Sequence, residues 1–538
     1  MAQVPRSKFV NWVTNQPQIL GGLLISVIDP PYNAKGDGVT DDIAAINAAI
    51  LDVSAAGGGT LYFPAGTYAM SSSLMPVSNV NLQGAGPDVT TIKNTLTGGP
   101  NPNNITLLIG STFTGGSHLD QLPNTATTYL VNSPTEGTNT VTTTTHADAG
   151  NFSAGQTVIV SGDAHGTSWW FSSWMTTVVS ANASTGIIML EENLPVGGSR
   201  ITRVQGLLAL TQNIKVSDMT ILGTNNESIQ VLGARNIVLD NIAIRPGSFG
   251  GTSGASHSFA GSRNCWMRNS VSYGVILDVL GCFGGGLINN TLNSGAIAVD
   301  GGSQDVLVGG NTVNDPTDGN GNNFHGIYLP GYTRRVRVIG NTIVNVNNSF
   351  FAGISSNGSI AGDGNHIIIG NTITGANTTT PQGVVLDNSV NNTIVGNWLN
   401  NLATGGSLSN GSTGNTVEAN TFVGVTTRYQ ISSDSSIREP FTAGLFKFTS
   451  NAGATPSVAD GHTFQIVNSS PQNVTNFTGG VSGQEIIVQF GDSNTTLIVS
   501  GGLFHLSGGI NYNPPVNTLM KFVFAFDVWY ELSRVTTN

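Results

Sequence analysis

A short motif recurs through the second half of the chain and limits what the chain can fold into. The motif is an aliphatic run, then Gly-Asn-Thr or a close variant, then another aliphatic residue, as at 306–313, 336–343 and 366–373. Its asparagine falls at positions 311, 341, 371, 397 and 420, in steps of 30, 30, 26 and 23 residues. A period of about 20 to 50 residues indicates a solenoid, a propeller or a repeat array.

The content of each repeat favours one of these architectures. Each unit holds short strands joined by Gly/Asn turns and leaves no room for a long helix, which excludes a helical solenoid. A propeller blade needs four strands in about 40 residues, more than these units hold. We therefore expect a parallel β-helix. The recurring asparagine is expected to lie in a turn, where it tolerates the left-handed conformation and can form a side-chain ladder.

The start of the chain predicts how the repeats begin. A turn rich in Gly and Asp at 32–42 precedes Ile43, Ile46 and Ile50, whose spacing places them on one face of a helix. Thr40 or Asp41 can cap this helix by accepting a hydrogen bond from its free N–H groups. The glycines at 57–59 end the helix, and 60–63 read as a strand that Pro64 stops. The aspartates of the turn are interpreted as structural.

Three segments, 33–42, 59–68 and 82–86, resemble the opening of the pectate-lyase-like superfamily of right-handed parallel β-helices. Phage tailspikes and many secreted polysaccharide-degrading enzymes belong to it. The resemblance implies an all-β, right-handed solenoid, a polysaccharide substrate and, by similarity to tailspikes, a homotrimer. It does not fix the activity, because the superfamily includes hydrolases, lyases, transferases and plain binding proteins.

Changes in this rhythm suggest five regions. We expect an N-terminal segment at 1–28, the start of the β-helix with its capping helix at 29–110, and a small β insertion at 111–205. The main β-helix is expected at 206–438. The last region, 439–538, reads as antiparallel strands separated by Asn/Gly turns and is expected to form a separate C-terminal β domain.

Composition narrows the class of partner. Charged residues make up 9% of the chain and hydrophobic residues 39%, which is not a disordered profile. The net charge of −11 argues against nucleic acid and makes neutral or weakly charged glycans the easier substrates. Cys265 and Cys282 could form a disulfide or stay as buried thiols. No zinc pattern or phosphate loop is found, so no metal or cofactor is expected.

The N-terminal residues lack the apolar core of a signal peptide, and the apolar run at 19–28 is too short to span a membrane. We therefore expect no membrane insertion. The resemblance to tailspikes and polysaccharide-degrading enzymes implies a location outside the cell or on a virion surface.

A second strand in each coil carries the candidate chemistry. Side chains alternate along a strand, so Ile297 and Val299 are expected to point into the core. Stacking the segments that end at Asp278 and Asp300 predicts two outward columns. One column is Asp278, Asp300, Pro330, Asn357 and Asp387, and the other is Ile276, Ala298, Tyr328, Ser355 and Val385.

Asp278 and Asp300 therefore lie on adjacent coils, roughly 4.8 Å apart. Two like charges this close cannot both ionise freely, so one pKa should rise, which is the acid/base division that glycoside hydrolysis uses. We expect these two carboxylates to be catalytic. The alternative is that each aspartate only caps the turn that ends its strand.

The next coil adds His325, Tyr328 and Arg335, within the densest polar cluster of the chain. We expect these residues to bind substrate. They also permit a lyase, in which Arg335 neutralises a uronate carboxylate and His325 or Tyr328 removes the proton. The alternative for His325 is a histidine whose hydrogen bonds only hold its turn. The alternative for the arginines is that they only face solvent.

Trp169, Trp170 and Trp174 cluster in the insertion. Flat aromatic faces suit stacking on sugar rings, and we expect these residues to bind glycan. A small insertion core or a subunit contact explains them equally well.

These observations favour a polysaccharide depolymerase that hydrolyses glycosidic bonds with Asp278 and Asp300. A polysaccharide lyase acting by β-elimination is the second hypothesis. A transferase that cyclises sugars and a non-catalytic glycan-binding or structural tail component remain open alternatives.

Overall fold

The structure is a computed structural model that divides into two compact units, residues 1–413 with 421–433, and residues 414–420 with 434–538. In the ranges it describes, no helix combines the length and hydropathy that a membrane crossing requires. The described residues are 23–95, 105–110, 125–161, 173–194, 197–198, 201–207, 209–223, 228–245, 256–317, 322–331, 333–347, 351–358, 363–376, 381–431, 436–438, 447–450, 453–458, 463–480 and 483–536.

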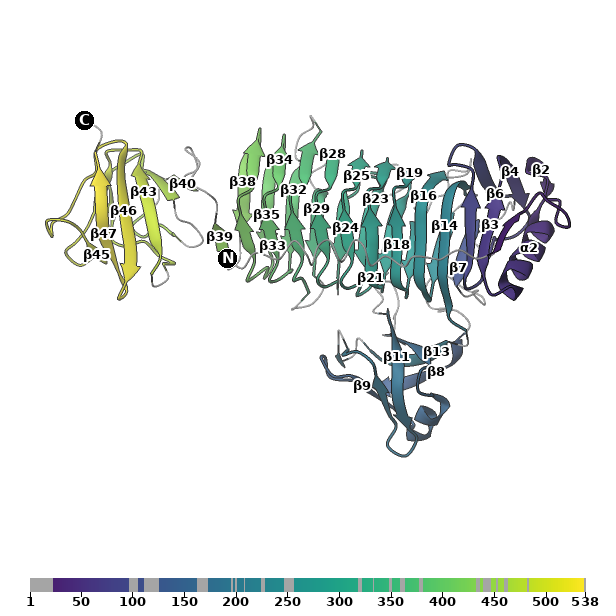
Figure 1. The fold of residues 1–538 in the computed structure, drawn as a ribbon. Helices are drawn as coiled ribbons and strands as arrows, with labels where there is room; N and C mark the ends of the chain where they lie inside the picture. The colour runs from purple at the N-terminus through teal and green to yellow at the C-terminus, as the bar shows by residue number, and fades with distance from the viewer. Residues whose placement is uncertain are drawn as a thin grey trace. The chain divides into compact units, whose positions relative to one another are not determined.

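The predicted parallel β-helix is confirmed, and most of its strands belong to the first unit. Figure 1 shows its strands from β14 to β38 stacked side by side. Most coils contribute two short strands to one long sheet and a third strand to a ten-stranded sheet. The ten strands are β7 (Leu107–Gly110), β15 (Ile229–Leu232), β17 (Ser256–Ala260), β20 (Ile276–Leu280), β23 (Ala296–Asp300), β26 (Ile327–Pro330), β29 (Ala352–Asn357), β32 (Gln382–Asp387), β35 (Thr404–Ser409) and β38 (Thr427–Ile431).

The other long sheet has 23 strands. They are β1 (Leu23–Ser26), β2 (Asp37–Asp41), β3 (Gly59–Phe63), β4 (Gly66–Met70), β5 (Val80–Gly84), β6 (Thr90–Asn94), β14 (Thr211–Leu222), β16 (Ala234–Arg245), β18 (Arg263–Arg268), β19 (Val271–Tyr273), β21 (Phe283–Ile288), β22 (Thr291–Asn293), β24 (Leu307–Gly309), β25 (Thr312–Asn314), β27 (Arg337–Ile339), β28 (Thr342–Val346), β30 (Ile367–Ile369), β31 (Thr372–Gly375), β33 (Thr393–Val395), β34 (Trp398–Asn400), β36 (Thr416–Glu418), β37 (Thr421–Val423) and β39 (Ser436–Arg438).

One helix, α2 (Ile43–Ala55), packs at the start of the β-helix and buries Ile46, Ala49, Ile50 and Val53. The aspartates before it are structural, as expected. The Asp42 carboxylate accepts hydrogen bonds from the backbone N–H groups of Lys35 and Gly36, at 2.6 and 3.0 Å. Asp41 accepts one from the first helical N–H, that of Ile43, at 3.2 Å.

The recurring asparagines form a ladder through the interior of the β-helix. From Asn290 to Asn397, each side-chain amide donates to the side-chain oxygen of the next asparagine, at 2.9–3.0 Å. The left-handed conformation that we expected at the asparagine belongs to the residue before it, such as Gly310 or Gly340, with φ near 65°. The asparagine itself turns inward, where all members of the ladder are at most 1% exposed.

The insertion forms a closed β barrel of six strands, with one short 3-10 helix, η2 (His146–Asn151). Its core contains Trp174, which is 5% exposed, together with Val158, Val160 and Ile188. The strands are β8 (Thr125–Asn132), β9 (Thr140–Thr143), β10 (Thr157–Ser161), β11 (Ser173–Asn182), β12 (Ile187–Leu190) and β13 (Arg203–Leu207).

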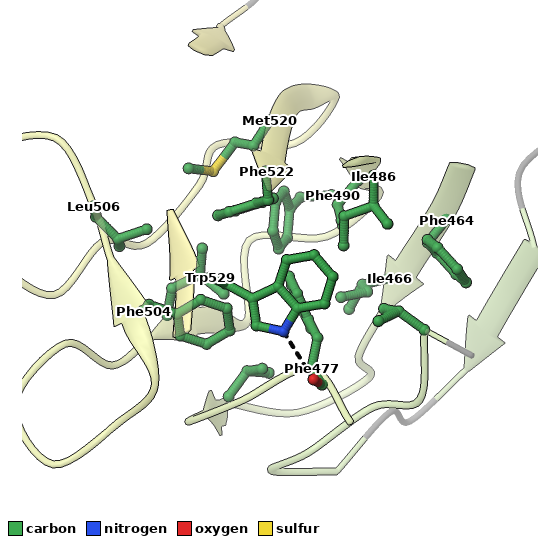
Figure 2. Close-up of a cluster of buried hydrophobic side chains, with 14 residues drawn as sticks. Phe464, Ile466, Phe477, Ile486, Phe490, Phe504, Leu506, Met520, Phe522 and Trp529 are labelled. Atoms are coloured by element: carbon green, nitrogen blue, oxygen red, sulfur yellow. Dashed lines mark hydrogen bonds between the residues drawn. The ribbon is translucent and has the colours of Figure 1, made fainter. Parts of the chain in front are cut away.

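The second unit has its own core around Trp529, whose indole N–H donates to the carbonyl of Phe477 at 2.8 Å (Figure 2). Its six-stranded sheet is mixed, because antiparallel and parallel pairs both occur. The strands are β40 (Lys447–Ser450), β41 (Thr463–Val467), β43 (Glu485–Phe490), β45 (Phe504–His505), β46 (Thr518–Ala525) and β47 (Val528–Val535), beside a pair formed by β42 (Gln472–Val474) and β44 (Thr495–Leu497).

The ladder predicts a large loss of stability when the side chain of one of its asparagines is truncated. Asn341→Ala removes two hydrogen bonds that the Asn341 amide donates and two that its oxygen accepts, all buried. Unsatisfied buried groups cost about 1–3 kcal/mol each, so we expect a loss of about 3–5 kcal/mol of unfolding free energy. Urea unfolding measures it.

Asn314→Ala is the matched control, because Asn314 makes one partly buried amide bond to Asn293 outside the ladder. Its loss should stay below about 1 kcal/mol. Equal losses in the two variants would contradict a special role for the buried ladder.

Candidate active site on the ten-stranded sheet

The candidate site lies on the outer face of the ten-stranded sheet. Along β23, Ile297 and Val299 are 0% exposed and point into the β-helix, as predicted. Asp300 therefore points to the opposite, outward face, because side chains alternate along a strand. Along β20, Leu277 and Val279 are buried in the same way, which leaves Asp278 outward.

The two aspartates are on adjacent coils, but they are not directly opposed. Asp278 pairs with Ala298, and Asp300 pairs with Leu280, so the predicted pairing of the first coil is wrong by two residues. The columns are otherwise as predicted, with Ala298, Tyr328, Ser355 and Val385 in register. The carboxylates are thus diagonal neighbours, with backbones about 7–8 Å apart.

The environment of Asp300 strongly perturbs its carboxyl group. Burial raises its pKa well above the usual aspartate range, and the nearby charge of Asp278 raises it further. One carboxyl oxygen, Oδ1, is inaccessible to solvent and accepts no hydrogen bond that would stabilise the ionised form. Asp300 therefore keeps its proton at pH values where an ordinary aspartate has lost it.

Aromatic rings border the carboxylates. Tyr328 follows Ala298 in the column, and its ring stacks on His325 with centroids 4.6 Å apart. Phe324 meets the Tyr328 ring edge-on at 5.6 Å, and Phe351 meets His325 at 5.1 Å. Sequence reasoning missed both phenylalanines. Their only signal was their place in corner loops beside β26 and β29.

The hydrogen bond at His325 fixes its tautomer. Its Nδ1 accepts the backbone N–H of Ala352 at 3.0 Å, so the proton of the neutral ring lies on Nε2. Burial lowers the pKa of His325 to about 4, which keeps the ring neutral near pH 7. The second ring nitrogen of His325, Nε2, is therefore a hydrogen-bond donor. Burial, and then the charge of Asp300, raise the pKa of Tyr328, so its phenol also keeps its proton.

Arg335 is engaged elsewhere. Its guanidinium binds both carboxylate oxygens of Asp305, at 2.8 and 2.9 Å, and also Gln304. These partners lie in the turn between β23 and β24, beyond the end of β23. The structure thus joins Asp278, Asp300, Tyr328 and His325 in one region and gives Arg335 a separate, structural partner.

The predicted tryptophan cluster is only partly described. Trp169 and Trp170 lie outside the described residues. Trp174 is buried in the barrel core, which supports the alternative of an insertion core for this residue.

The sequence left open whether Cys265 and Cys282 form a disulfide or stay as buried thiols. Cys265 and Cys282 are buried free thiols. Within the described ranges, no three His, Cys, Asp or Glu side chains gather closely enough to hold a metal ion.

Comparisons with known proteins support the predicted resemblance. Residues 25–252 match the family model described as rhamnogalacturonase A/epimerase, pectate lyase-like. The match ends before Asp278, so it concerns the beginning of the β-helix and not the candidate site.

Curated relatives match over a short stretch. Mannuronan C5-epimerase AlgE1 of Azotobacter vinelandii is 51% identical over 69 residues, which are 12% of this chain and 5% of that protein. Alginate lyase 7 of the same organism is 48% identical over 69 residues, 12% of this chain and 8% of that protein. The alignments thus span less than a tenth of either relative.

Solved structures resemble the chain over a longer range at low identity. The A-module of A. vinelandii mannuronan C-5 epimerase AlgE6 is 17% identical, covers 78% of this chain and 99% of its own, and has a TM-score of 0.46. The tailspike gp61 of Pseudomonas phage phi297 is 15% identical, covers 87% of this chain and 76% of its own, and has a TM-score of 0.38.

The tautomer and burial of His325 predict a pH dependence of stability. Its folded pKa of about 4 lies below the usual 6.5, so the unfolded chain binds the proton first. The stabilising contribution is complete above pH 6.5 and is lost as the pH falls toward 4, by up to roughly 3 kcal/mol. In His325→Gln, whose oxygen can accept the Ala352 N–H, the fall in Tm over this range should be smaller than in the unmodified protein.

His146→Gln is the control, because His146 lies exposed on the barrel insertion. This variant should keep the unmodified pH dependence. A His325→Gln protein with an unchanged fall in Tm would show that His325 is not held neutral by the fold.

Proposed function

We propose that the protein is a polysaccharide depolymerase that hydrolyses glycosidic bonds, with Asp300 as general acid and Asp278 as its ionised partner. One observation carries this proposal: burial and the neighbouring charge of Asp278 raise the pKa of Asp300 far above the ordinary range. Two carboxyl groups with separated pKa values are what glycoside hydrolysis requires.

Each carboxyl group has a defined part in the reaction. Asp300 donates its proton to the glycosidic oxygen as the bond to the leaving sugar breaks. Asp278, as a carboxylate, assists the attack of water on the sugar carbon where positive charge develops, so that a C–O bond to water replaces the bond to the leaving sugar. The outward, adjacent placement of the two residues lets one glycosidic bond reach both groups.

The aromatic rings and His325 supply binding contacts in this proposal. Tyr328 and Phe324 offer ring surface to the C–H face of a sugar, and the Nε2–H of His325 can donate to a sugar oxygen. The family model and the relatives support a polysaccharide substrate, because their names refer to rhamnogalacturonan, mannuronan and alginate.

Elimination is the second candidate, favoured by the similarity to alginate lyase 7. It would use His325 or Tyr328 to remove a proton and Arg335 to neutralise a uronate. The hydrogen bonding weighs against this assignment, since His325 carries its proton on Nε2, Tyr328 keeps its phenol proton and Arg335 is paired with Asp305. A non-catalytic glycan-binding protein is the third candidate.

Substitution of the carboxylates tests the proposed roles. Asp300→Asn and Asp278→Asn should each lower kcat on a cleaved polysaccharide by about 10²–10⁴-fold, because one proton-transfer group is lost. New reducing ends without an unsaturated product are measured. Asp387→Asn is the matched control, because Asp387 lies outward on β32, three coils beyond Asp300. It should retain nearly full activity.

Full activity in Asp300→Asn would remove Asp300 from the mechanism. An unsaturated product would show that the reaction is elimination and not hydrolysis. Binding of polymers without cleavage would show that the protein is a binding protein.

The resemblance to tailspikes leads us to propose a homotrimer located outside the cell or on a virion surface. Sedimentation equilibrium of the full chain should give a mass three times that of one 55.7 kDa chain. A monomer mass at micromolar concentration would contradict the trimer and would leave the proposed chemistry untouched.

A further inference from the structure

We infer that the site accepts an uncharged stretch of polysaccharide and discriminates against uronate polymers. This inference rests on the proposed function and adds the substrate class to it. The evidence for it is the distribution of charge over the outer face of the ten-stranded sheet. The inferred substrate is uncharged, unlike the polymers named for the curated relatives.

The face that carries the site is acidic. Asp278, Asp300 and Asp387 point outward from β20, β23 and β32. The strands β20, β23, β26, β29, β32 and β35 are all described, and their sequences contain no lysine or arginine. The same holds for the whole stretch 338–427, which includes the loops of the later coils.

Arg334 and Arg335, the first two arginines after β26 in the sequence, are already paired with carboxylates. Arg335 binds Asp305 through two hydrogen bonds. Arg334 forms an ion pair with Glu136 of the barrel insertion. Both arginines precede β27, in the turn that leaves the ten-stranded sheet. Recruiting either one to a substrate carboxylate would break an existing ion pair.

Coulomb repulsion then decides between the two substrate classes. Two like charges in contact near a protein surface repel each other more strongly than they would in bulk water, because the effective dielectric constant is lower there. A uronate bound across Asp278 and Asp300 would bring a further negative charge to strands whose sequences contain no lysine or arginine. It would also raise the pKa of Asp300 further.

An uncharged sugar avoids that repulsion and finds suitable contacts. Tyr328 and Phe324 provide ring surface beside the carboxylates. Further along the same face, Asn357 is exposed and Ser409 bonds to Asp387, so the neighbouring coils offer amide and hydroxyl groups. These groups match hydroxyl-rich, uncharged sugars.

Matched polymer pairs test the inference with the full chain. Polygalacturonate and mannuronan are each compared with their carboxyl-reduced forms. Amylose and galactan are each compared with forms whose primary alcohols are oxidised to carboxylates. Cleavage is followed by new reducing ends, and binding by affinity electrophoresis, at low and at high salt.

We expect the uncharged member of at least one pair to be cut at least tenfold faster than its charged partner, with a smaller difference at high salt. A charged member cut as fast as its uncharged partner, or faster, overturns the inference and leaves hydrolysis intact. An unsaturated product overturns the proposed hydrolysis. If no polymer is cleaved and none is bound, the proposed function is overturned, and the inference falls with it.

A charge introduced on the face gives a second, independent readout. Asn357→Lys places a cation on the outward column beyond Pro330 and should raise the rate on the oxidised polymer relative to the uncharged one severalfold. Asn400→Lys makes the same change on β34, in the other long sheet, and should leave the ratio unchanged. Equal ratios in both variants would show that charge on this face does not select the substrate.

Discussion

The position of every residue in the candidate site on the ten-stranded sheet depends on stacking successive coils in one register. Inside the β-helix, the ladder from Asn290 to Asn397 fixes that register, because each amide must meet the next one and a backbone carbonyl at the same time. A slipped coil would leave several buried polar groups without partners. Outside, the same register brings side chains from distant parts of the sequence, such as Asp278, Ala298 and Tyr328, into one column.

The sequence predicted the architecture well because its signals are local and repeated. The spacing of the Gly-Asn-Thr motif indicated the coils, and the inward direction of Ile297 and Val299 followed from alternation. The pairing of Asp278 with Asp300 failed for a physical reason. A shift of two residues leaves every side chain on its own face, so Leu277 and Val279 satisfy the core as well as Val275 and Leu277 would. Apolar alternation cannot distinguish these registers.

The chemistry of the site depended on contacts that no pattern encodes. The tautomer of His325 follows from the backbone N–H of Ala352, on the next coil. The engagement of Arg335 follows from Asp305, 30 residues earlier. Trp174 packs in the barrel because that strand turns it inward. The sequence pattern did not place these partners. The contacts of His325 and Arg335 support the proposed hydrolysis over elimination.

The central claim is that the fold holds Asp300 protonated beside an ionised Asp278. The most direct test is a titration of ¹³C-labelled aspartate side chains by NMR, with the Asp300 signal assigned through its loss in Asp300→Asn. The account predicts that Asp300 titrates well above the ordinary aspartate pKa of about 3.9 and that Asp278→Asn moves this titration to lower pH. An Asp300 that ionises at the ordinary value, with or without Asp278, would contradict it.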